Sequence, residues 1–369
     1  MNGPDSFEIV KLIGKGDVGR VYLVRHRDTG EAYAMKAMSK QEMMKRKKIQ
    51  RVLTEREILV TANHPFVVTL YYSFQTEDHL FFIMDFCAGG EFFRTLRTLP
   101  GRVKALPEAH AKFYAAEVLL GMEYLHMMGI IYRDLKPENI LLHASGHIML
   151  TDFNLSKQSQ VQTQAKVIRG MFDREDSARI DVKPDLVTNS FVGTEEYVAP
   201  EVISGHGHSS AVDWWTFGIL LYEMLFGRTP FRGKTRDETF GQILKCGLKL
   251  PDEPAVSREA KDLVKRLITL NPKKRLGATH GAADVKAHPF FQGVKWALLL
   301  NQTPPIIPNI SGPFDTSNFR TVKDDDGFVM TGSELPEEIV KNDKIFSQFT
   351  RVKRDPQSLS SPVARKGKK

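Results

Sequence analysis

The 369-residue sequence contains only two cysteines and no hydrophobic run long enough to cross a membrane. Neither Cys87 nor Cys246 has a second cysteine at the spacing of a metal-binding motif, which excludes a disulfide framework and a zinc site. The chain lacks both the roughly 18 consecutive apolar residues of a membrane span and the basic-then-apolar pattern of a signal peptide. With 41% hydrophobic and 26% charged residues, these absences predict a folded, soluble, cytoplasmic protein.

Excess positive charge is scarce in the body of the chain, although the formal net charge is +8. Residues 351–369 contain seven Lys or Arg residues and one Asp, so they carry +6 and leave only +2 for residues 1–350. A nearly neutral body argues against a surface that follows nucleic-acid phosphates. We expect residues 351–369 to form a basic disordered tail, which is a candidate for peripheral contact with an anionic membrane.

Hydrophobic periodicity divides the chain into a strand-rich part and a helical part. A period of two over residues 7–84, interrupted by one helical stretch at residues 49–59, predicts a small β-rich lobe with one main helix. Helical periodicity at residues 109–125 and 211–226 then predicts a larger, mainly helical lobe. The fold class is therefore α+β, with short strands at residues 140–142 and 147–150 and an extended tail from about Thr303.

A glycine-rich segment follows the first predicted strand. Residues 14–21 match the pattern GxGxxGxV, in which the missing side chains let backbone N–H groups approach phosphate oxygens. Strand-like alternation after Gly19 argues against the helix that a dinucleotide-binding loop requires, and an ordinary glycine-rich turn is the simpler alternative. A lone cation on an apolar strand, Lys36, and a carboxylate on the next helix, Glu55, favour the phosphate loop, since a buried lysine needs an ionic partner.

The segment from Tyr132 to Asn139 carries groups suited to phosphoryl transfer. Asp134 can accept a proton from a hydroxyl, and Lys136 can neutralise a transferring phosphoryl group. Asn139 and Asp152 offer hard oxygen ligands of the kind that Mg²⁺ prefers. A surface Asp-Lys pair beside a capping Asn is the alternative, and the ordered succession of phosphate loop, ion pair and catalytic segment argues against it.

These motifs, together with residues 193–201, 213–215 and 312–319, resemble those of a serine/threonine protein kinase of the AGC group. The sequence is similar to the catalytic subunit of cAMP-dependent protein kinase over nearly its whole length. Its pattern is closest to the fungal flippase-kinase-like and plant phototropin-like branches, in which a residue other than glycine follows Asp-Phe, as Asn154 does here. Asparagine tolerates the left-handed torsions that glycine adopts, so we expect activity to survive this replacement.

The resemblance implies the bilobal protein kinase fold. It places a kinase domain at residues 7–291, with an N-lobe at 7–84, a hinge at 85–90 and a C-lobe at 91–291. A C-terminal tail at residues 292–350 is expected to pack on this domain, ahead of the basic tail at 351–369. Two aromatic residues of the tail, Phe346 and Phe349, resemble a hydrophobic motif that docks beside the helix bearing Glu55.

The resemblance further implies transfer of the γ-phosphoryl group of ATP, with Mg²⁺, to Ser or Thr hydroxyls of proteins in intracellular signalling. The catalytic residues that it implies are Asp134, Lys136, Lys36, Glu55 and Thr194, and the implied metal ligands are Asn139 and Asp152. The implied ATP contacts are Ile13, Gly14, Lys15, Gly16, Asp17, Val18, Gly19, Arg20, Val21, Ala34, Lys36, Met84, Asp85, Cys87, Glu91, Glu138, Leu141, Thr151 and Phe319.

Three acidic positions match those that bind arginine in basic-directed members of the group. Glu91, Glu138 and Glu223 predict a preference for Arg three residues before the acceptor, because guanidinium groups pair bidentately with carboxylates. Ser190 stands where the family carries its activating phosphate, which would pair with Arg133 after the action of an upstream kinase.

Two alternatives from other functional classes remain open at this point. A catalytically silent scaffold that binds nucleotide and partners is suggested by Asn154 alone. An adaptor acting through residues 351–369 is suggested by their charge, and lipid is favoured over nucleic acid because this tail lacks aromatic residues for base stacking. We expect a monomer without a specific nucleic-acid partner.

Overall fold

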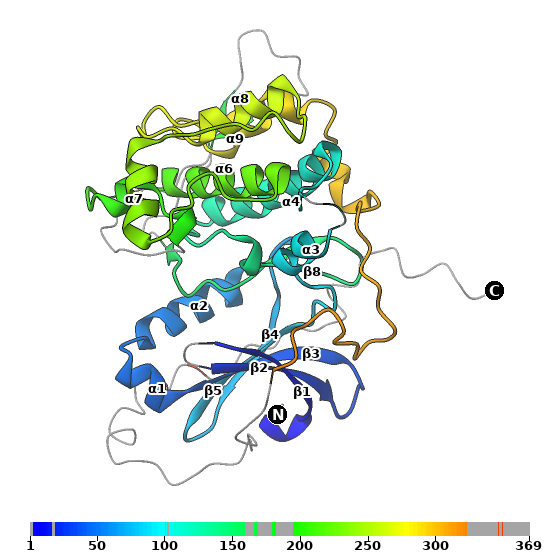
Figure 1. The fold of residues 1–369 in the computed structure, drawn as a ribbon. Coiled ribbons are helices and arrows are strands. Elements are labelled where there is room, and N and C mark those ends of the chain that lie inside the picture. Colours follow the sequence, from blue (N-terminus) through cyan, green and yellow to red (C-terminus); the bar gives the residue numbers. More distant parts are fainter. Residues whose placement is uncertain are drawn as a thin grey trace, which may run out of the picture. The chain divides into compact units, whose positions relative to one another are not determined.

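The computed structural model describes residues 3–16, 19–99, 101, 103–158, 166–168, 179–181, 195–207, 209–322, 346 and 349. The chain divides into two units, which Figure 1 shows as ribbons. Unit 1 comprises residues 1–63, 68–88 and 309–369, and unit 2 comprises residues 64–67 and 89–308. Of the sequence-based candidates, Asp17, Val18, Ser190, Thr194 and the basic tail lie outside the described residues.

Unit 1 is built on a five-stranded antiparallel sheet in the order β1-β2-β3-β5-β4. Its elements are the 3₁₀ turn η1 (Pro4–Ser6), β1 (Phe7–Lys15), β2 (Gly19–His26), β3 (Ala32–Ser39), α1 (Lys40–Lys45), α2 (Ile49–Thr61), β4 (Leu70–Gln75) and β5 (His79–Asp85). Phe7 lies in an aromatic core, with its ring centroid 6.0 Å from that of Phe74, which in turn stacks on Phe81 at 5.1 Å. The β-rich N-lobe is thus confirmed, with α1 as an additional helix.

Helix α2 forms where the sequence predicts the main helix of the small lobe. Its buried residues Val52, Glu55, Ile58 and Leu59 recur every three or four positions and therefore line one face. One of these residues, Glu55, has a carboxylate rather than an apolar side chain. The helix thus carries a charged group into the interior of unit 1.

Unit 2 is mainly helical, as the periodicity predicts. Its helices are α3 (Phe92–Thr98), α4 (Glu108–Met127), α5 (Pro200–Ile203), α6 (Ala211–Phe226), α7 (Arg236–Lys245), α8 (Arg258–Leu267) and α9 (Ala282–Lys286), with 3₁₀ turns η2 (Pro137–Asn139), η3 (Glu195–Tyr197), η4 (Pro289–Phe291) and η5 (Trp296–Asn301). Its strands are β6 (Gly90–Glu91), β7 (Ile130–Ile131), β8 (Ile140–Leu142), β9 (Ile148–Leu150), β10 (Lys157–Gln158), β11 (Lys166–Ile168) and β12 (Arg179–Asp181). They pair as β6-β8-β9, β7-β10 and β11-β12.

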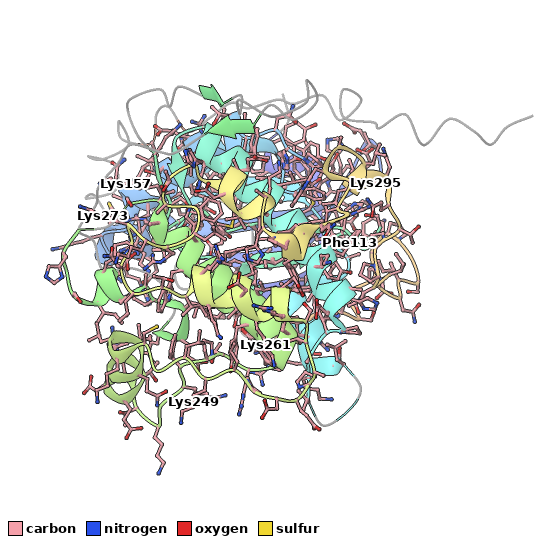
Figure 2. All side chains as sticks on the ribbon, turned by 90° about the horizontal axis from the view of Figure 1, so that it is seen from above. Phe113, Lys157, Lys249, Lys261, Lys273 and Lys295 are labelled. Carbon is pink, nitrogen blue, oxygen red and sulfur yellow. The ribbon has the colours of Figure 1, made fainter. Side chains whose placement is uncertain are left out.

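Helix α6 is the most deeply buried helix among the described residues of unit 2 and packs beside α4 and α8 (Figure 1). A Cβ on Gly218 would lie 2.8 Å from Leu267 of α8, so glycine permits this close approach. The helix ends at Gly227, whose φ of 68° is left-handed. In the view of Figure 2, Lys261 projects from α8, and the exposed Lys249 and Lys273 lie toward the edge.

No helix in the part of the chain that the structure describes combines the length and the apolar character needed to cross a membrane.

Candidate active site

The catalytic segment of unit 2 folds around Asp134, which is only 5% exposed. Lys136 Nζ donates to Asp134 Oδ2 over 2.8 Å, and Asn139 Nδ2 donates to the same oxygen and to the main-chain carbonyl of Asp134, each over 2.8 Å. Burial raises the pKa of Asp134, opposed by Lys136 and Asn139, and the charge of Asp152 raises it further. A buried carboxylate held by two donors is a fixed proton acceptor that is more basic than a solvated one.

Asp213, in the first turn of α6, anchors the backbone of this segment. Its Oδ2 accepts from the N–H of Tyr132 over 2.9 Å, and its Oδ1 accepts from the N–H of Arg133 over 2.7 Å. His126 Nε2 lies 2.7 Å from Asp213 Oδ2. Arg133 has a φ of 66°, which is unusual for a residue other than glycine. The buried carboxylate therefore holds the catalytic segment in a strained backbone conformation.

Tyr132 connects the catalytic segment to the segment that contains Asp152. Its hydroxyl donates to the carbonyl of Thr151 over 2.5 Å, and its ring lies against Phe153 with centroids 5.3 Å apart. Asp152 has a φ of 59°, whereas Asn154 does not adopt a positive φ. The left-handed tolerance expected of Asn154 is therefore not used in this structure.

The glycine-rich segment of unit 1 forms a hairpin between β1 and β2. Gly14 pairs with Val21, and the N–H of Gly16 donates to the carbonyl of Gly19 over 2.8 Å. A Cβ on Gly19 would lie 2.3 Å from the carbonyl oxygen of Ala37 on β3, so the sheet itself requires glycine there.

The other two glycines of this hairpin have no such structural requirement. A Cβ on Gly14 or Gly16 would meet no atom of the described residues closer than 3.5 Å, and neither glycine has a positive φ. The sheet would accept a side chain at both positions. Glycine at these two positions agrees with the predicted close approach of phosphate oxygens to the backbone.

Lys36 and Glu55 form an ion pair between β3 and α2. Lys36 Nζ lies 2.7 Å from Glu55 Oε1 and 2.9 Å from Oε2, and the side chains are 19% and 2% exposed. Because breaking a buried pair leaves an uncompensated charge, each partner fixes the other. The lysine is thereby held in one orientation.

The candidate adenine contacts Met84, Asp85 and Cys87 lie at and just after the end of β5. The Asp85 carboxylate accepts from the N–H of Thr69 and from the hydroxyl of Tyr71, both over 2.7 Å, so this side chain serves the fold of unit 1. The tail residue Phe319 stacks on Phe86 with centroids 5.6 Å apart. Most of the remaining candidate ATP contacts lie on strands or close to their ends: Ile13 and Lys15 on β1, Arg20 and Val21 on β2, Ala34 on β3, Glu91 on β6, Leu141 on β8, and Thr151 after β9. Glu138 lies in the 3₁₀ turn η2.

Two of the three predicted arginine-binding acids line one cavity of unit 2. The cavity has a volume of about 450 Å³, and Glu138 and Glu223 are among its lining residues. Burial raises the pKa of both carboxyls. The charge of Glu138 raises the pKa of Glu223 further, against a hydrogen bond of 2.5 Å that Tyr197 donates to Glu223 and against the charge of Arg97. Glu91 is not a lining residue, although its charge also raises the pKa of Glu138.

Comparison with known proteins identifies the family. Residues 7–291 match the protein kinase domain. The chain belongs to the protein kinase family. It is 56% identical over 339 residues to serine/threonine-protein kinase nrc-2 of Neurospora crassa, covering 90% of this chain and 54% of that protein. It is 58% identical over 314 residues to flippase kinase 1 of Saccharomyces cerevisiae, covering 84% and 34%, and 50% identical over 308 residues to phototropin-1A of Oryza sativa, covering 82% and 33%.

These relatives confirm the AGC-type resemblance and its relation to the flippase-kinase and phototropin branches. This kinase chain spans about half the length of nrc-2 and a third of the other two proteins.

The residues of this kinase fit ATP with Mg²⁺, the cofactors of the family. The Asn139 amide directs its N–H groups at Asp134, which leaves its oxygen for a cation beside Asp152. Among the described residues, no three His, Cys, Asp or Glu side chains form a metal-binding group. An amide and a carboxylate suffice for Mg²⁺, since this ion retains waters and takes further ligands from nucleotide phosphates.

The two aromatic residues of the tail motif are fully buried within unit 1. Phe349 stacks on Phe82 with centroids 5.4 Å apart, and its carbonyl accepts from Arg56 Nε over 3.1 Å and from Ser73 Oγ over 3.0 Å. Phe346 lies under the ammonium of the buried Lys40, 5.1 Å from the ring centroid. Arg56 belongs to α2, so the motif contacts the helix that carries Glu55.

Several site residues were not assigned by the sequence analysis. Asp213 anchors the catalytic segment from about 80 positions away, and Tyr197 bonds to Glu223 across the acidic cavity. Both residues lie within motifs that matched the kinase pattern. The motifs indicated that these residues matter, but not which residues they bind. The basic residues that line the same cavity belong to no motif that the sequence analysis identified.

Proposed function

We propose that this chain is an active serine/threonine protein kinase that transfers the γ-phosphoryl group of MgATP to protein hydroxyls. The observation that supports this most directly is the buried Asp134 carboxylate, held by Lys136 and Asn139 at hydrogen-bond distance. A silent scaffold would have no need for a fixed basic carboxylate in this position. The names of its relatives as serine/threonine kinases support the same activity.

Each residue of the catalytic segment has a defined task in this reaction. An oxygen of the Asp134 carboxylate takes the proton of the substrate hydroxyl. The hydroxyl oxygen forms a bond to the γ-phosphorus of ATP, and the bond between that phosphorus and the leaving oxygen of ADP breaks. Lys136 stabilises the negative charge of the transferring group, and Asn139 and Asp152 would hold Mg²⁺. When bound, the ion neutralises charge on the phosphate oxygens.

A radiolabelled phosphate-transfer assay on the full chain tests this proposal. We expect incorporation into Ser or Thr that depends on Mg²⁺, and a loss of 10²-fold to 10⁴-fold in Asp134→Asn, since proton transfer by a positioned base contributes about that factor. Equal incorporation by wild type and Asp134→Asn, or none by either, would favour the scaffold.

We further infer that substrates carry arginine before the acceptor. Glu138 and Glu223 are half-buried carboxylates, and the charge of Glu138 raises the pKa of Glu223. A guanidinium between them would offset that repulsion with bidentate hydrogen bonds. Acidic peptides would be repelled by the same pair.

An oriented peptide library tests the preference for arginine. We expect Arg to be selected before the acceptor, and Glu223→Gln to raise the KM of such peptides with little change in kcat. Glu259→Gln, which removes an exposed carboxylate on α8 outside the cavity, is the matched control. Equal KM values for peptides with Arg or Ala at every position would refute the preference.

Regulation, location and oligomeric state are further parts of the proposal. We propose a cytoplasmic monomer that an upstream kinase activates at Ser190, and a basic segment at residues 351–369 that contacts anionic membranes. Full activity of Ser190→Ala would contradict the first of these roles. Sedimentation with phosphatidylserine vesicles, repeated at high salt, tests the second, because binding by basic residues is salt-sensitive.

A further inference from the structure

The acidic cavity of unit 2 is also lined by basic side chains. Beside Glu138 and Glu223 it contains Glu195 and Glu196 of η3. Four cations balance these four carboxylates: Arg97, Arg232, Lys234 and Arg236. The formal charge of the lining residues is therefore zero, although the cavity contains acids suited to binding arginine.

The carboxylates fall into an inner and an outer pair. Glu138 and Glu223 form the inner pair, and within the described residues neither of these carboxylates forms an ion pair with Arg232 or Arg236. The outer pair is matched by arginines of this chain. Arg236 Nε lies 3.6 Å from Glu195 Oε1, and Arg232 Nε lies 3.6 Å from Glu196 Oε1.

The two outer ion pairs are weak enough for a substrate to compete with them. The side chains of Arg232 and Arg236 are 69% and 54% exposed, and each Nε lies 3.6 Å from its carboxylate oxygen, farther than the roughly 2.7–2.9 Å of a charge-assisted hydrogen bond. The Arg236 guanidinium also lies over the ring of Phe240, 5.0 Å from its centroid. Exposed pairs of this kind contribute about 0.2–1 kcal/mol each. The two arginines are thus paired with the outer carboxylates at the protein surface, and they are not buried in the hydrophobic core of unit 2.

We infer that Arg232 and Arg236 are specificity-determining residues that occupy the outer carboxylates and so limit the number of arginines a substrate can present. This inference rests on the proposed preference for arginine and refines it. A first arginine is bound by the inner pair. Each further arginine must displace a guanidinium that the chain itself supplies and gains little from doing so.

The electrostatics of the cavity give the direction of the effect. Replacing Arg232 and Arg236 by Ala changes the formal charge of the lining residues from zero to −2. Without their arginines, the carboxylates of Glu195 and Glu196 would attract additional basic residues of a peptide, although Glu196 would keep the hydrogen bond that the hydroxyl of Thr229 donates to its other oxygen. A role in folding alone would instead change kcat for every peptide alike.

Steady-state kinetics on peptides with one, two or three arginines before the same acceptor test this inference on the full chain. For wild type we expect kcat/KM to change by less than about threefold across the series. For Arg232→Ala/Arg236→Ala we expect the three-arginine peptide to gain about tenfold over the one-arginine peptide, mainly through KM, which corresponds to about 1.4 kcal/mol. At 1 M salt the gain should disappear, because the screening length falls to about 3 Å.

Two further variants separate charge in the cavity from charge elsewhere. Lys273→Ala/Lys274→Ala removes the same charge from exposed positions outside the cavity and should behave as wild type; Lys273 is labelled in Figure 2. Arg232→Lys/Arg236→Lys keeps a positive charge at both positions, so kcat/KM should still change little when further arginines are added to the peptide. If Arg232→Ala/Arg236→Ala shows the same kcat/KM values across the peptide series as wild type, and both still require the first arginine, this inference is overturned and the proposed substrate preference stands. Loss of that dependence in wild type overturns the proposed substrate preference and this inference with it.

Discussion

Two glycines of the β1–β2 hairpin should respond differently to the same added methyl group. In Gly19→Ala the new Cβ would stand 2.3 Å from the carbonyl oxygen of Ala37, which is backbone and cannot swing aside. Strands β2 and β3 would have to separate by several tenths of an ångström. Overpacking of this kind costs about 1–3 kcal/mol of unfolding free energy. In Gly16→Ala the nearest atom of the described residues lies at 3.5 Å, so the change in stability should stay within about 1 kcal/mol.

The functional effect should follow the opposite order. If phosphate oxygens approach the backbone at Gly16, a methyl group there blocks their path, and we expect the KM for ATP to rise about tenfold, or about 1.4 kcal/mol of binding free energy. Urea unfolding and ATP titration of the same preparations measure both quantities. Gly247→Ala, at an exposed position with no atom within 4 Å, is the control and should change neither.

The outcome separates the two interpretations of the glycine-rich segment. If Gly16→Ala lost as much stability as Gly19→Ala, packing of the hairpin would explain both glycines. If Gly16→Ala left the KM for ATP unchanged, the phosphate-loop assignment would be refuted for this position.

Three further substitutions test other parts of the protein. Asn139→Leu removes the amide that orients Asp134, so we expect a loss of at least about a hundredfold in kcat and a higher Mg²⁺ requirement in a Mg²⁺ titration; an unchanged requirement would contradict its role as a ligand. Burial lowers the pKa of His64 to about 4, against about 6.5 in the unfolded chain. The unfolded chain therefore binds a proton at His64 at a higher pH than the folded protein does, and the free energy of unfolding should fall by up to about 3 kcal/mol as the pH drops from 6.5 toward 4. His64→Gln should flatten urea-derived stability over this range, and a parallel decline would assign the loss to other groups. Phe349→Ala removes a buried ring stacked on Phe82, at a typical cost of about 3–5 kcal/mol; we expect a lower thermal midpoint and weaker phosphotransfer, and an unchanged midpoint would show that the ring is dispensable.

Periodicity predicted the long elements of the fold and also the short strands β8 and β9, but it missed the short helix α1. Helix α6 begins and ends where the apolar pattern of residues 211–226 does, because nearly every residue is buried and Gly227 stops it. Helix α1 has only six residues, of which Lys40 and Met43 are buried. A segment with two buried positions has no detectable period, so it could not be predicted.

Motif spacing likewise predicted the catalytic residues of the site but not the distant residues that form ion pairs within it. Asp134, Lys136 and Asn139 lie within six positions, so one segment indicates all three. Arg232 and Arg236 pair with glutamates more than 35 positions away in sequence, and only the tertiary fold brings the loop before α7 and the start of α7 close to η3. No local pattern distinguishes such arginines from ordinary surface charges.

The energetics of the catalytic segment indicate that it is positioned before a substrate binds. Arg133 and Asp152 both adopt left-handed backbone conformations, which cost about 1–2 kcal/mol each. Against this, Asp213 accepts two backbone hydrogen bonds from the segment, and bonds to a charged group contribute about 1.5–3 kcal/mol each. The hydroxyl of Tyr132 adds a bond to the carbonyl of Thr151. Since these bonds offset the strain without any ligand, Asp134 is held ready to accept a proton by the fold alone.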